Sequence, residues 1–357
     1  TDDSIFRFEI PSHGDLLMDS YFSINIPNIY SPIYCDESSD ISFVQPYEFK
    51  WVKKLGFNLI KNIRLMIDGT VIQEFTGQYL SNMIERDFTE EKKKLVYEMI
   101  GHTSELNDPA NYSNRNGHYP NASNNNYDIN KWVDGPEPSI RGRKIYIPLN
   151  LFCGLISEMS LPLVSLEYSK VYIEITCRPI KELFVIRDIS WLRSAADYNK
   201  MVTGSNEAWS IPDRYNYYNV PYIAPDFNNP AHKMFYFLNA PPYNKYYVTG
   251  TSDDIDNDQG KYLNISESWD YDSHLVCSYG FLDKEERRYF AGRPQKYLIK
   301  QVHEKIDYNI LNSQRSKIEN KGLTTSFMWF FQRTDIKLRN EWSNYTNWEF
   351  DTMPAES

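Results

Sequence analysis

Cysteine is scarce and scattered in this sequence, with only 4 copies in 357 residues. Cys35, Cys153, Cys177 and Cys277 form no CxxC pair, which excludes zinc ribbons and dithiol redox motifs. A disulfide framework is not expected at this density, so we expect reduced thiols in a reducing compartment. Cys153 and Cys177 lie near predicted strands, and we expect both to behave as buried hydrophobic residues.

Long hydrophobic runs are missing as well. No window approaches the roughly 18 consecutive apolar residues that a membrane-spanning helix needs. No charged and then apolar leader of the secretory kind opens the sequence. It starts at Thr1 instead of a methionine, so we expect a processed chain or a fragment of a longer polypeptide.

Positive charge is in deficit. The chain has 38 Lys and Arg against 48 Asp and Glu, a net charge of −10, which is the wrong sign for wrapping nucleic acid. Hydrophobic residues at 41% and charged residues at 24% are typical of a globular protein of one large domain or two. Aromatic residues reach 15%, led by 28 Tyr, and tyrosine favours strands and wet interfaces.

Catalytic and metal-binding motifs are absent. The histidines occur singly, with no HxH or HExxH pair, and GxSxG, GxxxxGK[ST] and GxGxxG are all missing. We therefore expect no enzyme activity, no metal and no cofactor, although carboxylate pairs for glycosidase chemistry stay open among 48 acids. The acidic run 253–258 could hold calcium, but it lacks the glycine and final glutamate of an EF-hand loop, so a solvated loop is favoured.

Period-two alternation is the dominant pattern and predicts antiparallel strands. It covers residues 21–27, 63–67, 144–149 and 170–176, and residues 324–332 form a run that is apolar on both faces. Asp68-Gly69 predicts a type I′ hairpin turn with residues 70–72 as the returning strand. The sequence therefore predicts an all-β fold with half-buried antiparallel sheets.

Helices and long polar segments interrupt these strands. Residues 78–100 show helical spacing around a charged run, 90–94, that we expect to face solvent. Asp283 and Glu286 have the spacing of a capping box, which predicts a short helix over 285–291. Residues 103–143 and 205–260 are rich in polar residues and predict long loops. We expect residues 111–130 and 205–260 to lie on an outer face or across subunit boundaries.

Several motifs occur in the order found in one family. They fall within residues 11–27, 51–80, 146–168 and 279–301, and this ordered set resembles the major capsid protein of the nucleocytoplasmic large DNA viruses. The signature residues carried by the resemblance are Gly14, Asp15, Leu16, Trp51, Gly56, Asp68, Gly69, Gly77, Pro148, Pro162, Asp283, Glu286, Arg287 and Phe290. We expect them to shape turns and strand ends and to do no chemistry.

The resemblance implies a double jelly roll, two eight-stranded antiparallel sandwiches in tandem. It places the first roll at 1–185 with an excursion at 101–143, a connection with a long loop or tower at 186–270, and a second roll at 271–357. Since this second roll lacks its closing strands, we expect the chain to be part of a longer polypeptide.

The same resemblance implies a structural virion protein that forms homotrimeric, pseudo-hexameric capsomers of an icosahedral shell. Its expected partners are itself, neighbouring capsomers, and minor capsid and penton proteins, with no direct contact to nucleic acid. Assembly is expected in the host cytoplasm, and an internal viral membrane can lie beneath a shell that does not itself span a membrane.

A second function class stays open. The chain could be a jelly-roll lectin that binds glycans through exposed aromatic, Asp and Asn side chains on a virion or cell surface. Oligomeric state discriminates the two, because a capsomer is a stable trimer. Weak glycosylation sequons start at Asn111, Asn121, Asn264 and Asn344.

Overall fold

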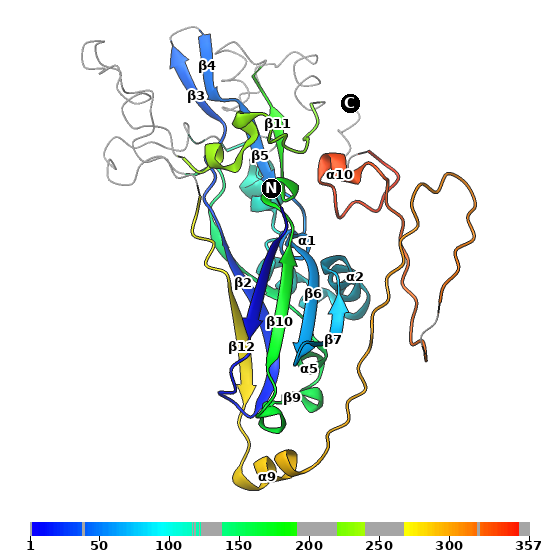
Figure 1. Ribbon diagram of the computed structural model, residues 1–357. Helices are drawn as coiled ribbons and strands as arrows, with labels where there is room; N and C mark the ends of the chain where they lie inside the picture. Colours follow the sequence, from blue (N-terminus) through cyan, green and yellow to red (C-terminus); the bar gives the residue numbers. More distant parts are fainter. Residues whose placement is uncertain are drawn as a thin grey trace, which may run out of the picture.

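The computed structural model describes residues 2–37, 40–115, 117, 119–120, 122, 138–190, 220–239, 268–319 and 322–349. Within them the fold is mostly β-sheet with few helices, as the alternating pattern predicts (Figure 1). The acidic run 253–258, and residues 123–137, 205–219 and 240–260 of the predicted loops, lie outside the described part.

One antiparallel sheet holds the N-terminal strand and has the order β1-β10-β6-β7. Its strands are β1 (Ser4–Glu9), β10 (Val171–Cys177), β6 (Ile60–Ile67) and β7 (Thr70–Phe75). Side chains of β10 alternate strictly between buried and half-buried, which confirms the strand predicted over 170–176.

The turn between β6 and β7 has the predicted conformation. Asp68 and Gly69 have φ of 48° and 81°, the positive values that a type I′ turn requires. The Asp68 carboxylate also accepts a hydrogen bond of 2.8 Å from the Lys170 main-chain N–H, so the turn is tied to the start of β10.

A second antiparallel sheet has β2 (Leu16–Ile26) at its centre. β2 pairs with β8 (Arg143–Pro148) on one side and with β12 (His274–Gly280) on the other, and β9 (Leu161–Pro162) joins its first residues. These pairings confirm the strands predicted over 21–27 and 144–149.

The two sheets pack face to face, and the core lies between them. Phe6 and Phe8 of β1 place their rings 5.8 and 6.1 Å from the ring of Phe22 in β2, which is fully buried. Aromatic contacts at this spacing are favourable beyond their buried area. The sandwich therefore forms because β1 and β2 each turn their apolar face inward.

Two small sheets extend one end of the sandwich (Figure 1). They pair β5 (Tyr47–Trp51) with β11 (Phe184–Asp188) and β3 (Ile33–Glu37) with β4 (Asp40–Gln45). Phe49 of β5 stacks on Phe184 of β11 with ring centroids 4.7 Å apart.

The helical region predicted over 78–100 is two helices, α2 (Gly77–Asp87) and α3 (Glu90–Met99). The break lies at Thr89, whose extended backbone and side-chain hydrogen bond to the Lys92 N–H cap α3. Residues 90–94 are largely exposed, as predicted for a solvated face. A short α1 (Leu55–Leu59), which the sequence did not predict, precedes β6.

The C-terminal part differs from the expectation in two respects. Residues 324–332, predicted as a central strand, form no strand, because no described segment offers them a hydrogen-bonding partner. β12, placed by the predicted division in the second roll, hydrogen-bonds to β2 on the edge opposite β8. The division at residue 271 itself stays a prediction.

Short elements complete the described chain. The helix predicted over 285–291 is α9 (Lys284–Gly292), and its capping box of Asp283 and Glu286 is confirmed. The remaining elements are α4 (Ser104–Asn107), α5 (Phe152–Leu155), α10 (Ile336–Arg339), and the 3₁₀ turns η1 (Tyr112–Asn114), η3 (Ser157–Met159), η4 (Leu163–Leu166), η5 (Ile180–Glu182), η6 (Pro230–His232) and η7 (Met234–Phe237).

Candidate functional site

Signature residues that are far apart in the sequence meet at the start of α9. The Asp15 carboxylate accepts hydrogen bonds of 2.8 Å from the Leu282 N–H and 2.9 Å from Arg287 Nη2. Next to them, Asp283 and Glu286 complete the cap of α9. The Leu282 N–H and then Arg287 lower the pKa of Asp15, so this carboxylate is ionised and joins the N-terminal turn to α9.

Three signature glycines lie where another main chain or side chain approaches closely. A Cβ on Gly14 would be 2.6 Å from Tyr279 Cβ, and one on Gly56 would be 2.8 Å from Ile147. A Cβ on Gly77 would overlap the carbonyl oxygens of residues 57 and 60, which are main-chain atoms. At these three positions only a residue without a Cβ fits the close approach.

The other signature residues lie in strands, turns and the core. Trp51 is buried in the apolar cluster, Pro148 ends β8 opposite Tyr21, and Pro162 of β9 pairs with Leu16. The carbonyl oxygen of Phe290 accepts a 2.8 Å hydrogen bond from Ser165, which fastens α9 to η4.

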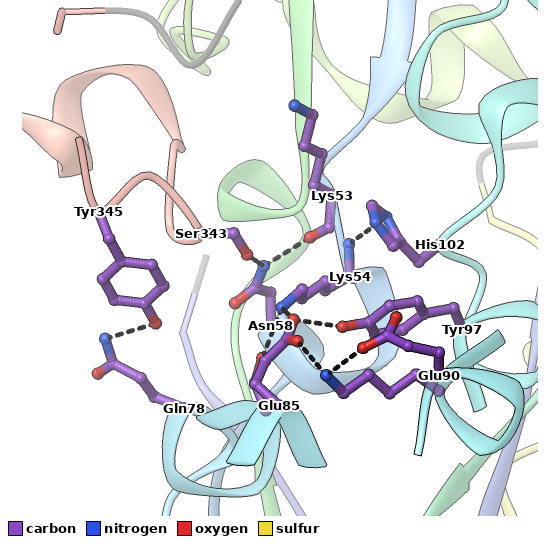
Figure 2. Close-up of polar contacts among 12 residues, drawn as sticks. Lys53, Lys54, Asn58, Gln78, Glu85, Glu90, Tyr97, His102, Ser343 and Tyr345 are labelled. Carbon is purple, nitrogen blue, oxygen red and sulfur yellow. Dashed lines mark hydrogen bonds and ion pairs between the residues drawn. The ribbon is translucent and has the colours of Figure 1, made fainter. Parts of the chain in front are cut away.

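A polar network joins α1, α2 and α3 (Figure 2). Lys54 Nζ lies 2.5 Å from Glu85 Oε1, Tyr97 donates to the same oxygen, and Lys93 bridges Glu85 and Glu90. Burial alone would raise the pKa of Glu85, but hydrogen bonds from Lys54 and Tyr97 outweigh it and lower the value to about 2. The carboxylate is therefore a fixed charge that holds three helices together.

The outer side of this network contacts the C-terminal part of the chain. Asn58 Nδ2 donates to the Lys53 carbonyl and, at 3.0 Å, to Ser343 Oγ (Figure 2). Gln78 Nε2 donates to Tyr345 Oη at 3.3 Å. Sequence reasoning missed these contacts because they depend on polar residues without a motif.

A buried charge cluster in the small β5-β11 sheet was also missed. Arg187 pairs with Glu48, and both side chains are almost fully buried. Tyr222 donates to the same Glu48 oxygen at 3.1 Å, and Lys50 Nζ lies 4.1 Å from the Tyr222 ring centroid. Burial lowers the pKa of Lys50 to about 8. The signal in the sequence was the alternation of two charged residues, Glu48 and Lys50, with the aromatic residues of 47–51.

The described part of the chain contains three free thiols. Across the described ranges, no three His, Cys, Asp or Glu side chains gather into a group that could hold a metal ion. In the same part of the chain, no helix is both long and apolar enough to cross a membrane. Cys153, Cys177 and Cys277 are free thiols, and burial raises the pKa of both Cys153 and Cys177 to about 12.

The sequons differ in accessibility. Asn111 is exposed, with its amide donating to Asp108 at 2.9 Å. Asn344 is only 2% exposed, and its amide nitrogen donates to Glu341 and to the Trp348 carbonyl, which leaves no room for a sugar in this conformation. Asn121 and Asn264 lie outside the described residues.

The segment between α9 and α10 carries many exposed apolar side chains. Leu298, Leu311 and Leu323 are at least 91% exposed, and Trp329 is 78% exposed. Others in the segment are Ile306, Tyr308, Ile310, Ile318, Phe327, Phe330 and Phe331. Exposed apolar side chains in such number are typical of a surface that another segment or chain covers.

An open groove of about 620 Å³ lies beside the edge of the second sheet. Trp269, Asp270, Asn25 and Asn28 contribute to its lining, a set that could contact a sugar. However, the Trp269 indole N–H already donates to the Asn25 carbonyl at 2.9 Å, and Asn28 accepts from the Gly142 N–H at 2.7 Å. These groups are engaged within the chain, so the groove gives little support to a lectin.

Comparisons with known proteins agree with the ordered motifs. Residues 4–217 match the family model described as the major capsid protein N-terminus. Probable capsid protein 4 of Acanthamoeba polyphaga mimivirus is 23% identical over 347 residues, covering 90% of this chain and 61% of that protein. The major capsid protein of Frog virus 3 is 23% identical over 182 residues, covering 51% and 34%.

The solved structures that are similar to this chain include the quasi-atomic model of the PBCV-1 virus capsid. The match has a TM-score of 0.39 and 14% sequence identity, and it covers 84% of this chain and 48% of that one. The chain thus spans between about a third and three fifths of the curated relatives named above. Since the family model matches more than half of its residues, the chain belongs to the family of viral major capsid proteins.

Proposed function

We propose that this chain is a structural component of a viral shell, acting through assembly and without catalysis. The match of residues 4–217 to the major capsid protein family carries the proposal. The sandwich of antiparallel sheets supports it, because its signature glycines, prolines and Asp15 are all engaged in packing and turns.

In this proposal the described sandwich is the first of two jelly rolls. The segment after α9 begins the second roll, and its many exposed apolar residues support the idea that it packs against further structure. The division into 1–185, 186–270 and 271–357 remains part of the proposal, with β12 belonging by its pairing to the first sandwich.

The working unit is a homotrimer. Three chains of two rolls give six similar lobes, which tile a hexagonal lattice although the closed symmetry is threefold. Obligate interfaces of roughly 2,000–5,000 Å² would stabilise such a shell without disulfides. Neighbouring capsomers, minor capsid proteins and penton proteins are the further partners, in a virion assembled in the host cytoplasm.

Light scattering and negative-stain microscopy of the protein purified from virions test this proposal. We expect a particle of three chains with a pseudo-hexagonal outline, and tighter association at higher salt because each chain carries a net charge of −10. A monomer at micromolar concentration that is retarded on immobilised glycans would refute the capsomer and favour the lectin. Stoichiometric zinc, iron or manganese by elemental analysis would refute the absence of a metal centre.

A further inference from the structure

The C-terminal part of the described chain buries several side chains, whereas the segment before it leaves many apolar side chains exposed and contacts the rest of the chain at fewer points, among them Tyr297 and Gln301. Ile336 and Trp342 are 8% exposed and Asn340 is 4% exposed, whereas Leu298, Leu311 and Leu323 further upstream are at least 91% exposed. We call residues 332–345 the clasp. Figure 1 shows the chain running from α9 past the sandwich to α10, within the clasp.

Side chains of the clasp donate hydrogen bonds to three main-chain carbonyls at the turn between β10 and β11. Asn340 Nδ2 donates to the carbonyls of Lys181 at 2.7 Å and Phe184 at 2.9 Å. The Trp342 indole N–H donates to the Glu182 carbonyl at 2.8 Å. Two side chains separated by one residue thus satisfy three acceptors, a pattern that fixes the register of the clasp on the turn.

Further contacts surround this central pair. The Arg178 guanidinium lies 4.0 Å from the Trp342 ring centroid, in cation–π geometry. Asn58 donates a hydrogen bond to Ser343, and Gln78 donates one to Tyr345 (Figure 2). A buried tryptophan beside an arginine, with polar contacts around them, is typical of the residues that contribute most to binding energy at an interface.

The backbone of the clasp is shaped for this contact. Asn340 has φ of 55° and ends α10 in the left-handed conformation, which turns its side chain and that of Trp342 toward the same surface. Within the clasp, Gln332 Nε2 donates to the Trp342 carbonyl at 2.8 Å, closing the loop that carries the tryptophan.

We propose that the surface formed by Arg178, the 181–184 turn, Asn58 and Gln78 is a docking site for the clasp of the same chain. Its role is to fix the position of the chain after α9 against the first sandwich. The 293–331 segment that precedes the clasp makes no strand in its described part, although Tyr297 and Gln301 hydrogen-bond to the sandwich, so the contacts of the clasp add a second point of attachment further along the chain. This inference rests on intrachain geometry and does not depend on the shell function.

Hydrogen exchange of the 357-residue chain, read by mass spectrometry, tests the site. Asn340→Gly keeps the left-handed backbone available and removes only the side-chain donors. Trp342→Ala removes the anchor, and Trp348→Ala is the matched control because Trp348 is 59% exposed in the same segment. We expect exchange of residues 336–345 to accelerate about tenfold or more in the first two variants, with β6 and β10 still protected.

A synthetic peptide of residues 332–349 gives a second readout. It should bind Trp342→Ala protein, whose site is vacated, and bind the unsubstituted chain far more weakly. Unchanged exchange of 336–345 in Asn340→Gly, or equal acceleration in Trp348→Ala, would overturn the proposal. Loss of protection on simple dilution of the unsubstituted chain would also overturn it, because it would show that a second copy supplies the clasp.

Discussion

The contact between Asp15 and the start of α9 gives the sharpest test of how the signature residues act. In Asp15→Ala the Leu282 N–H and Arg287 lose their shared acceptor. A hydrogen bond to a charged group contributes about 1.5–3 kcal/mol. The Arg287 side chain is 54% exposed, so its ion pair adds less than about 1 kcal/mol. We therefore expect a loss of about 2–3 kcal/mol in the free energy of unfolding.

Asp15→Asn separates the two contributions. The Asn side-chain oxygen can still accept from the Leu282 N–H, so the loss should fall to about 1 kcal/mol. Urea unfolding followed by tryptophan fluorescence measures both variants, with the exposed Asp2→Ala as the control. A double-mutant cycle with Arg287→Ala should return a coupling energy below about 1 kcal/mol.

The pH dependence has a definite sign. Since the pKa of Asp15 is lowered in the folded chain from its ordinary value of 3.8, its stabilisation is present above that value and is lost as the pH falls through the folded pKa. The stability difference between the unsubstituted chain and Asp15→Ala should therefore shrink below about pH 4. A difference that is absent at neutral pH, or constant down to the lowest pH reached, would refute this account of Asp15.

Three further predictions concern other buried positions. Gly77→Ala should lower the free energy of unfolding by about 3 kcal/mol, because the new Cβ would meet two main-chain carbonyl oxygens that cannot rotate away. A loss below about 1 kcal/mol would contradict this. Lys50 has its pKa lowered by burial to about 8, below the unfolded value of 10.5. The free energy of unfolding should therefore rise by about 3 kcal/mol between pH 8 and pH 10.5 relative to Lys50→Met; equal pH profiles in urea unfolding would exclude the effect. Burial raises the pKa of Cys153 and of Cys177 to about 12, so both should react with a thiol reagent only on unfolding, whereas the half-buried Cys277 should react earlier. Rapid labelling of all three thiols in the native chain would show that the core is wrongly assigned.

Local chemistry in the sequence determined a large part of this fold. The alternation in 170–176 specifies β10 because a half-buried strand needs one apolar face. Asp68-Gly69 specifies a hairpin because both residues tolerate positive φ, and Asp283 with Glu286 specifies the start of α9 through a capping box. Each of these signals acts over a few neighbouring residues, so it is visible without the tertiary structure.

Tertiary structure alone decided the contacts between distant segments. Residues 324–332 have strong strand character but form no strand, because a strand also needs a neighbour for its main-chain hydrogen bonds. β12 joined the sheet of β2 on the edge opposite β8, and the availability of that edge is not encoded within residues 274–280. Asn340 and Trp342 dock on the 181–184 turn through carbonyl oxygens, which every residue possesses and no sequence pattern marks. The sequence thus specified those elements that carry a strong local signal, and three-dimensional packing decided the other elements and the pairing of them all.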